Sequence, residues 1–117
     1  MNKLAMQCVV KLLEIDLNTG EYKVVHLDKG ENTTTSPFLA DWVNSSCSKE
    51  LIHPDYIDVF KTVTDIEHIK KVLKYKKYIH LKFKRMPYKN GEYRDTVMTI
   101  IQKDEYKAYM ILYDIEN

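Results

Sequence analysis

The four histidines, His26, His53, His68 and His80, are the side chains of this sequence best suited to bind a metal ion. No two of them have the short spacing that brings a pair of zinc ligands into one turn. A haem iron would need an axial histidine that faces a cavity. His26 and His80 instead fall on polar strand faces, and His68 falls on an exposed helix face. His53 precedes a helix, where it would cap or pack, so we expect no metal site and no haem.

The two cysteines, Cys8 and Cys47, have no paired spacing. A disulfide between them is one alternative, and reduced thiols in an intracellular compartment are the simpler interpretation. Cys8 stands among apolar residues and is expected in the core of a strand. Cys47 stands among serines at the end of a helix, which indicates a small structural residue and not a reactive thiol.

Residues 69–91 hold nine Lys or Arg side chains and no acidic one. Aromatic side chains lie between the basic ones: Tyr75, Tyr78, Phe83 and Tyr88. Such a stretch could follow a nucleic-acid backbone and stack on bases. The alternative is a helix end, whose carbonyl groups favour cations, followed by an edge strand that its lysines protect. The net charge of only +1 favours the alternative, so we expect no nucleic-acid partner.

The length of 117 residues is that of one domain. With 44% hydrophobic and 30% charged residues, the chain can bury one core and keep a solvated surface. No apolar run approaches the roughly 18 residues of a membrane span. Lys11 interrupts the N-terminal stretch that could otherwise serve as a signal peptide. We therefore expect a cytoplasmic domain that makes no membrane contact.

Two strands open the order of elements that the sequence predicts. Residues 8–17 are rich in β-branched and apolar types, with Val9 and Leu13 on the apolar side and Lys11 as the exception on that side. A tight turn follows, in which a glycine can take positive φ. Residues 21–29 form the second strand, and a polar loop comes after it.

Three short helices are expected next. The first has Ser36 as its cap, with a proline at its first position and Phe38 in its apolar stripe. The second starts at Pro54. The third starts at Thr64, which forms a capping box with Glu67. Apolar residues at helical spacing give each helix one face to bury.

The patterns of residues 78–86, 92–102 and 106–115 predict three more strands, with an Asn90-Gly91 turn between the first two. Consecutive hairpins make these strands antiparallel neighbours. The last two are apolar on both faces, which indicates central strands or a face that a partner covers. The fold class is therefore α+β, a five-stranded antiparallel sheet with short helices packed on one face.

Five stretches resemble motifs of the PAS family, and they come in the family's order. They are the first hairpin, the short helix after it, the H-P-D motif, the hairpin before the fourth strand and the exit motif: Asp16–Tyr22, Leu39–Val43, Leu51–Asp55, Tyr88–Arg94 and Asp114-Ile115. The sequence departs from the family at Tyr56, in place of a second Asp, and at Asp95, in place of a Trp. The resemblance covers nearly the whole chain.

The resemblance to PAS domains implies the strand order 2-1-5-4-3 and a single sensor domain over residues 1–117, excised from a longer bacterial signalling protein. It implies a non-catalytic regulatory module in signal transduction that binds a small ligand or a partner and dimerises through the sheet or the termini. The module would control an attached effector such as a diguanylate cyclase or a histidine kinase. Flavin-linked members carry a reactive Cys in an N-C-R-F motif, which Ser45–Ser48 does not match, so we expect no cofactor.

Three sets of site residues follow from the resemblance and the patterns. A ligand cavity between helices and sheet would be lined by Trp42, Phe60, Phe83, Val97 and Leu112, and a filled core is the alternative. A dimer contact on the last strand would use Tyr109, Ile111 and Tyr113, because tyrosine suits interfaces, and plain edge packing is the alternative. Asp114 and Ile115 would form the connection through which the module controls the attached effector domain.

The alternative function is that of a small cone-shaped α+β enzyme of the ketosteroid-isomerase type. Its chemistry needs a carboxylate with a raised pKa inside a pocket, together with an oxyanion donor. Asp95 shares strand parity with Tyr93 and Val97, so it could face inward. A half-exposed aspartate in a hairpin strand is the simpler interpretation, and the pattern lacks the long N-terminal helix of that enzyme class.

Overall fold

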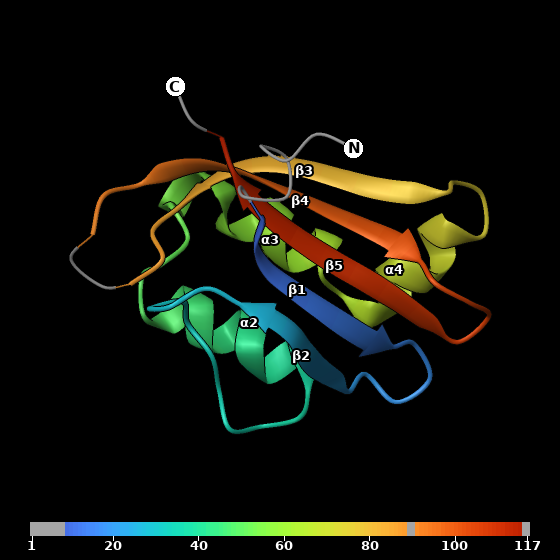
Figure 1. Ribbon diagram of the computed structural model, residues 1–117. Coiled ribbons are helices and arrows are strands. Elements are labelled where there is room, and N and C mark those ends of the chain that lie inside the picture. Colours follow the sequence, from blue (N-terminus) through green and yellow to red (C-terminus); the bar gives the residue numbers. More distant parts are fainter. Residues whose placement is uncertain (1–8, 89–90, 116–117) are drawn as a thin grey trace.

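Five strands form one antiparallel sheet in the order β2-β1-β5-β4-β3 (Figure 1). The computed structural model describes residues 9–88 and 91–115. The strands are β1 Val9–Asp16, β2 Tyr22–Leu27, β3 Tyr78–Arg85, β4 Arg94–Gln102 and β5 Lys107–Asp114. The predicted α+β class, the five-stranded antiparallel sheet and its strand order are therefore confirmed. The predicted Asn90-Gly91 turn falls partly outside the described residues.

Short helices cover one face of this sheet (Figure 1). They are α2 Leu39–Ser48, the 3-10 turn η1 Pro54–Tyr56, α3 Ile57–Val63 and α4 Ile66–Leu73. Their apolar stripes meet the inward side chains of the strands in one core, to which α3 contributes Phe60, α4 Ile69 and β5 Met110. In the part of the chain that the structure describes, no helix combines the length and the apolar character needed to cross a membrane.

Strand β1 departs from a regular ladder at two places. Its register shifts between Val9 and Lys11 against β5, and between Leu12 and Leu13 against β2. Irregularities of this kind turn side chains to a different face. Val10 joins the core, so the predicted place of Val9 there is wrong, whereas Lys11 is buried on the core side. The exception in the apolar pattern is thus a lysine that runs into the interior.

Helix α2 begins later than predicted. Its N-cap is Phe38, in extended conformation, and Ser36 Oγ accepts from the amide of Phe38 one turn before the helix. The side chain of Phe38 is 46% exposed, so it does not belong to the apolar stripe.

Helix α4 begins after Asp65 and not at Thr64. The Asp65 carboxylate accepts from the amide of His68 at 3.0 Å, which satisfies one of the free N–H groups of the first turn. The Thr64 hydroxyl instead donates to the carbonyl of Phe60 at 2.7 Å, at the end of α3. The predicted capping box of Thr64 and Glu67 is therefore wrong.

Candidate functional site

Charged side chains are buried at one end of the core, between the sheet and the segment that joins β2 to α2. Arg85, the last residue of β3, donates from Nη1 to Glu31 Oε1 at 2.7 Å and from Nη2 to Glu31 Oε2 at 3.2 Å. The two side chains are only 5% and 4% exposed. Two parallel charge-assisted bonds fix both the position and the plane of a carboxylate. Glu31 thus occupies an anion site inside the protein.

Lys11 is the second cation on the Glu31 carboxylate. Its Nζ lies 3.5 Å from Glu31 Oε1, donates to the carbonyl of Asn32 at 3.0 Å and stands 4.7 Å from the centre of the Trp42 ring. Burial lowers the pKa of Lys11 from its ordinary 10.5 to about 8, with Glu31 acting against this shift and Arg85 adding to it. Lys11 therefore holds its proton much less firmly than an exposed lysine does.

Asp114, at the end of β5, meets the same guanidinium from another side. Arg85 Nη2 donates to Asp114 Oδ1 at 3.1 Å, and Thr96 Oγ1 donates to the same oxygen at 2.9 Å. Arg94 Nη1 donates to Asp114 Oδ2 at 3.3 Å from the exposed rim. One guanidinium thus joins a loop carboxylate to the strand end where the predicted output residues Asp114 and Ile115 lie. We call Lys11, Glu31, Arg85 and Asp114 the buried cluster.

Backbone contacts on both sides hold Arg85 in place. It pairs with Arg94 on β4, and on its other side it forms an isolated bridge with Ile52. The amide of Met86 donates to the carbonyl of Leu51 at 2.8 Å. The segment before η1 therefore covers the edge of β3 at this point, which helps to bury the Arg85 side chain.

Glu31 reaches the buried cluster from residues 28–37, a segment without helix or strand. Gly30 precedes it with φ +89°, a conformation that residues with a side chain rarely adopt. Asn32 fastens the segment, because its carbonyl accepts the lysine bond described above and its side-chain amide donates to Ser46 Oγ at 3.2 Å. Bonds at Asn32, together with backbone bonds of Asp28 and Pro37 at the two ends, therefore hold this segment against the rest of the fold.

A cavity of about 10 Å³ lies beside the buried cluster, which is about the space of one water molecule. Lys11 and Arg85 line it together with Trp42, Phe60 and Leu112. The Nε of Arg85 is buried and has no hydrogen-bond partner among the described residues. Three of the five residues predicted to line a ligand cavity therefore meet here, although the space between them is nearly filled.

The other two residues of that prediction, Phe83 and Val97, lie elsewhere. Phe83 is buried in the core, where its ring centre lies 5.3 Å from that of Phe60. Val97 lies on the opposite face of the sheet, beside Tyr113 of β5, so the prediction that it lines the interior is wrong. Because β4 is apolar on both faces, alternation does not tell which of Val97 and Met98 turns inward, and the buried residue is Met98.

The predicted dimer residues Tyr109, Ile111 and Tyr113 share the sheet face opposite the described helices, which we call the outer face. All three are half-buried. In the register of the strands, Ile111 lies beside Leu12 of β1 and Tyr113 beside Val97 of β4. These side chains form an apolar stripe across the middle of the outer face, and their role as a dimer contact stays a prediction.

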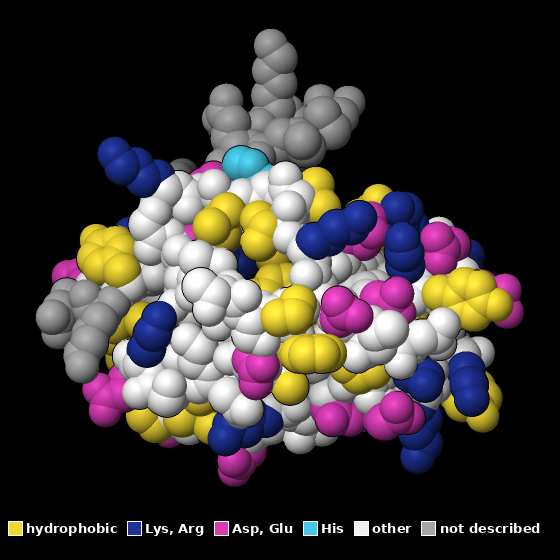
Figure 2. Space-filling model, turned by 90° about the horizontal axis from the view of Figure 1, so that it is seen from below, with side chains coloured by type: hydrophobic (Ala, Val, Ile, Leu, Met, Phe, Trp, Pro, Cys, Tyr) yellow, Lys and Arg dark blue, Asp and Glu magenta, His cyan; other side chains and the backbone are white. Residues whose placement is uncertain are grey.

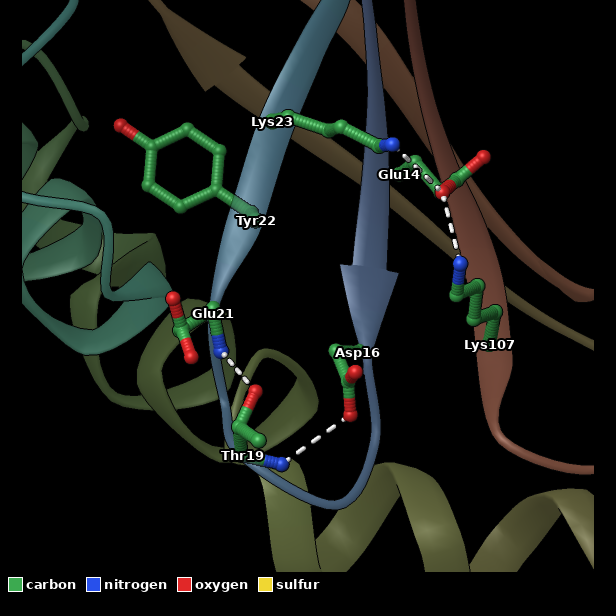
Figure 3. A pocket seen from close by; sticks show the side chains of 7 residues that line it. All are labelled: Glu14, Asp16, Thr19, Glu21, Tyr22, Lys23 and Lys107. Carbon is green, nitrogen blue, oxygen red and sulfur yellow. Dashed lines mark hydrogen bonds and ion pairs between the residues drawn. The ribbon is translucent and has the colours of Figure 1, made fainter.

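Charged side chains gather near the β1–β2 turn (Figure 3). One of them, Glu14, lies opposite Tyr109 in the register of β1 and β5, at the border of the apolar stripe. Glu14 accepts from Lys103 at 2.8 Å and lies within 3.6 Å of Lys107, and the bond from Lys103 lowers the pKa of Glu14. Asp16 accepts from backbone amides of the turn, which lowers its pKa as well. These carboxylates line a hollow of about 260 Å³. Because both are held in the ionised form, neither suits general acid catalysis near neutral pH.

Asp95, the acid of the alternative enzymatic function, lies on the outer face and not inside a pocket. It accepts from Lys84 at 3.0 Å, and this bond lowers the pKa of Asp95. A general base of the expected kind needs a raised pKa and an enclosed site. The half-exposed aspartate of the simpler interpretation is what the structure has, and the inward placement that the alternative function requires is not found for Asp95.

The basic, aromatic stretch is divided between the surface and the core. Tyr75 is exposed after α4, Tyr78 at the start of β3 and Tyr88 after β3, while the fourth aromatic side chain is buried. Lys84 and Arg85 are engaged in ion pairs. On the face that Figure 2 turns to the viewer, basic, acidic and apolar side chains are all present. The expected absence of a nucleic-acid partner stays a prediction.

Three of the histidines, His26, His53 and His80, make local side-chain hydrogen bonds. His53 Nδ1 accepts from the amide of Asp55 at 3.1 Å and caps η1, as its position in the sequence predicts. His80 Nδ1 lies 2.8 Å from Thr99 Oγ1 on the neighbouring strand. Within residues 9–88 and 91–115, no three His, Cys, Asp or Glu side chains gather in a way that could hold a metal ion.

Cys47 is a free thiol at the end of α2. Burial raises its pKa, which is the opposite of the shift that activates a thiolate. The predicted core position of Cys8 lies outside the described residues.

The sequence pattern did not single out Glu31 or Arg85, which are separated by 54 residues. The one available signal was Lys11, a charged residue on the apolar side of a strand. A buried lysine requires a partner of opposite charge, since an unpaired charge is costly to bury. The pattern does not tell which of the loop carboxylates supplies that partner.

Comparisons of this chain with protein-family models, with curated proteins and with solved structures found no significant match. Membership of the PAS family therefore stays a prediction based on the motifs. The geometry of the buried cluster is the main guide to function.

Proposed function

We propose that this chain is a non-catalytic regulatory module of the PAS type, which acts in bacterial signal transduction in the cytoplasm. The state of the segment that carries Glu31 is passed through Arg85 to Asp114, at the strand end that leads to an attached effector domain. The module works as a homodimer through its outer face. In this role it uses no cofactor, binds no nucleic acid and does not contact the membrane.

The observation that carries this proposal is the shared guanidinium of Arg85. Its Nη2 bonds both Glu31, in the segment 28–37, and Asp114, at the end of β5. Removing one partner from a buried ion pair costs about 3–5 kcal/mol, because the remaining charge is left uncompensated. If Glu31 leaves, Arg85 must find new partners, and the contact with Asp114 changes with it. Contiguous ionic contacts of this kind can couple two sites energetically.

A change in the contact between Arg85 and Asp114 would alter the end of β5. Asp114 is held there by Thr96 and Arg94 as well as by Arg85, and the amide of Ile115 donates to the carbonyl of Asp95 at 2.9 Å. Strand ends open at a lower free energy than strand centres do. The amide of Ile115 is therefore a sensitive reporter of the state of the buried cluster.

Support for the homodimer comes from the composition of the outer face. Its middle is the apolar stripe around Ile111 and Tyr113, and its border holds ion pairs such as Glu14 with Lys103 and Lys84 with Asp95. An apolar centre with a polar rim is the usual anatomy of a protein interface.

Hydrogen–deuterium exchange at the amides of residues 113–115 tests the coupling. In Glu31→Ala we expect these amides to exchange faster than in the wild type, because Arg85 no longer holds Asp114 in one position. Glu67→Ala is the matched control, since it removes a carboxylate from a surface ion pair with Lys70 at 3.6 Å. The control should exchange like the wild type. Equal exchange in all three proteins would contradict the proposed coupling.

A further inference from the structure

We propose that Lys11 and Arg85 form a binding site for a small carboxylate with a short apolar tail, and that this ligand takes the place of the Glu31 side chain. The inference rests on the regulatory function proposed above and names the class of its ligand. In the protein without ligand, Glu31 is the internal anion of the site.

The charges of the site call for an anion. Arg85 gives two bonds to Glu31, and Lys11 Nζ lies 3.5 Å from the same carboxylate. Asp114 balances one positive charge from the other side of the guanidinium, and Arg94 adds a further cation at the rim. Without Glu31 the site carries excess positive charge. A planar guanidinium binds a carboxylate through two parallel bonds, so a ligand carboxylate can reproduce what Glu31 provides.

Arg85 also has a donor that Glu31 does not use. Its buried Nε–H has no partner among the described residues, although buried polar groups nearly always have one. The Glu31 carboxylate takes up the two Nη atoms and is tied to its own backbone. A free carboxylate, which no backbone restrains, can turn toward the Nε–Nη2 edge of the guanidinium in exchange for the bond to Nη1. The site therefore offers a ligand a buried donor that its internal anion leaves unused.

The cavity beside the buried cluster would hold the apolar tail of the ligand. It measures about 10 Å³ and is lined by the apolar side chains of Trp42, Phe60 and Leu112 as well as by the two cations. Departure of Glu31 would add the volume of its two methylene groups to this space. Because the core around it is closely packed, a tail of about two to three carbons is the size that fits.

The bonds that oppose the departure of the Glu31 side chain are those of its carboxylate to Arg85 and Lys11, which a ligand carboxylate would replace. The backbone of Glu31 adds little to them, although Asn32 beside it stays fastened. Its segment, residues 28–37, belongs to no strand, and the amide of Glu31 donates only to the carbonyl of Asp28, at 3.2 Å, in the local turn. Glu31 nevertheless competes with the ligand as a tethered group, whose effective concentration is high. Removal of the Glu31 carboxylate should therefore tighten the binding of a free carboxylate.

The fluorescence of Trp42 tests the site directly, because Trp42 is the only tryptophan of the chain and its ring stands next to Lys11. The full chain is titrated with sodium propionate at constant ionic strength, set with sodium chloride. Propionamide serves as the neutral control of the same shape, and sodium phosphate as the control for other anions. The same titrations are made with Glu31→Ala and with Lys11→Met.

In the wild type we expect a saturable change with propionate and none with propionamide or phosphate. In Glu31→Ala the dissociation constant should fall at least about tenfold, since the tethered competitor is gone. In Lys11→Met the response should be lost or strongly weakened. If Glu31→Ala does not fold, the wild type and Lys11→Met still decide the question.

A wild type that does not respond to propionate overturns the inference, even if Glu31→Ala binds it, because Glu31 is then a permanent structural anion. An equal response to phosphate overturns the ligand class. Neither result touches the coupling to β5, which amide exchange measures without ligand. Altered exchange at residues 113–115 with no propionate response would reject the ligand and keep the regulatory function.

Discussion

Arg85 and Asp114 belong to strands that are not neighbours, since β4 lies between β3 and β5, yet Arg85 Nη2 lies 3.1 Å from Asp114 Oδ1. The contact spans Thr96 of β4, whose hydroxyl donates to the same carboxylate oxygen. One acid thus ties three strands together at one end of the core. A displacement of the Arg85 guanidinium would therefore act on β4 and β5 together.

Replacement of Arg85 by methionine should destabilise the protein strongly. The change leaves Glu31 and Asp114 without their main partner in a buried setting, and breaking a buried ion pair costs about 3–5 kcal/mol. Urea unfolding followed by Trp42 fluorescence gives the free energy of unfolding. Arg94→Met removes the exposed cation from the same Asp114 and should cost less than about 1 kcal/mol. Similar losses in the two variants would contradict the assigned roles.

The free energy of unfolding of the wild type should rise, relative to that of Lys11→Met, as the pH increases above about 8. The pKa of Lys11 is about 8 in the folded protein, between Glu31 and Arg85, against an ordinary 10.5. Below pH 8 both the folded and the unfolded state hold the proton, so the unfavourable burial of the charge is fully present. Above it, the folded state releases the proton while the unfolded chain keeps it, which favours folding.

The expected gain is at most about 1.4 kcal/mol per pH unit. Urea unfolding of the wild type and of Lys11→Met at several pH values from 7 to 10 measures it, since the difference between the two curves cancels the other titrating groups. A difference that stays constant with pH would show that the Lys11 amine titrates normally in the folded protein.

Phe83→Ala should lower the free energy of unfolding much more than Val97→Ala, because the two residues lie on opposite faces of the sheet. Phe83 is buried in the core, so its truncation should cost about 3–5 kcal/mol. Val97 is half-buried on the outer face, and its truncation should cost less than about 1 kcal/mol in the monomer. Thermal unfolding at low protein concentration compares the two. A larger loss for Val97 would contradict the assignment of faces on β4.

The proposed homodimer predicts that sedimentation velocity of the wild type shows a mass that rises with protein concentration. Ile111→Glu should keep the protein monomeric, because it places a charge in the middle of the apolar stripe. Tyr75→Glu, at an exposed position after α4, is the control and should dimerise like the wild type. A wild type that stays monomeric at every concentration, or a control that also fails to dimerise, would remove the support for the outer face as a dimer contact.

Local patterns of this sequence were enough to predict most of the fold. Strict alternation in residues 78–86 gave β3 its inward Ile79 and Phe83, and helical spacing gave α4 its buried Ile69 and Leu73. These signals depend only on the repeat of 2 or 3.6 residues along one element. Together with the hairpins, they predicted an antiparallel five-stranded sheet, whereas the strand order, with β1 beside β5, was implied by the resemblance to PAS domains.

The local patterns predicted less where two neighbouring residues could both cap a helix or both be buried. Thr64 and Asp65 are both good helix caps, and the competing carbonyl of Phe60 draws the Thr64 hydroxyl to the preceding helix. Val97 and Met98 are both apolar, so only their contacts with the rest of the fold decide which one is buried.

By itself, then, the sequence determined the elements, their order and the class of the fold, because each of these follows from interactions between residues close along the chain. The buried cluster of Lys11, Glu31, Arg85 and Asp114 was decided by the tertiary structure alone. A lysine of β1, a glutamate of the loop after β2 and an arginine at the end of β3 meet only once the sheet has formed and the helices exclude water. Ion pairs between residues so far apart in the sequence produce no periodic pattern, because they depend on which segments the tertiary fold brings together.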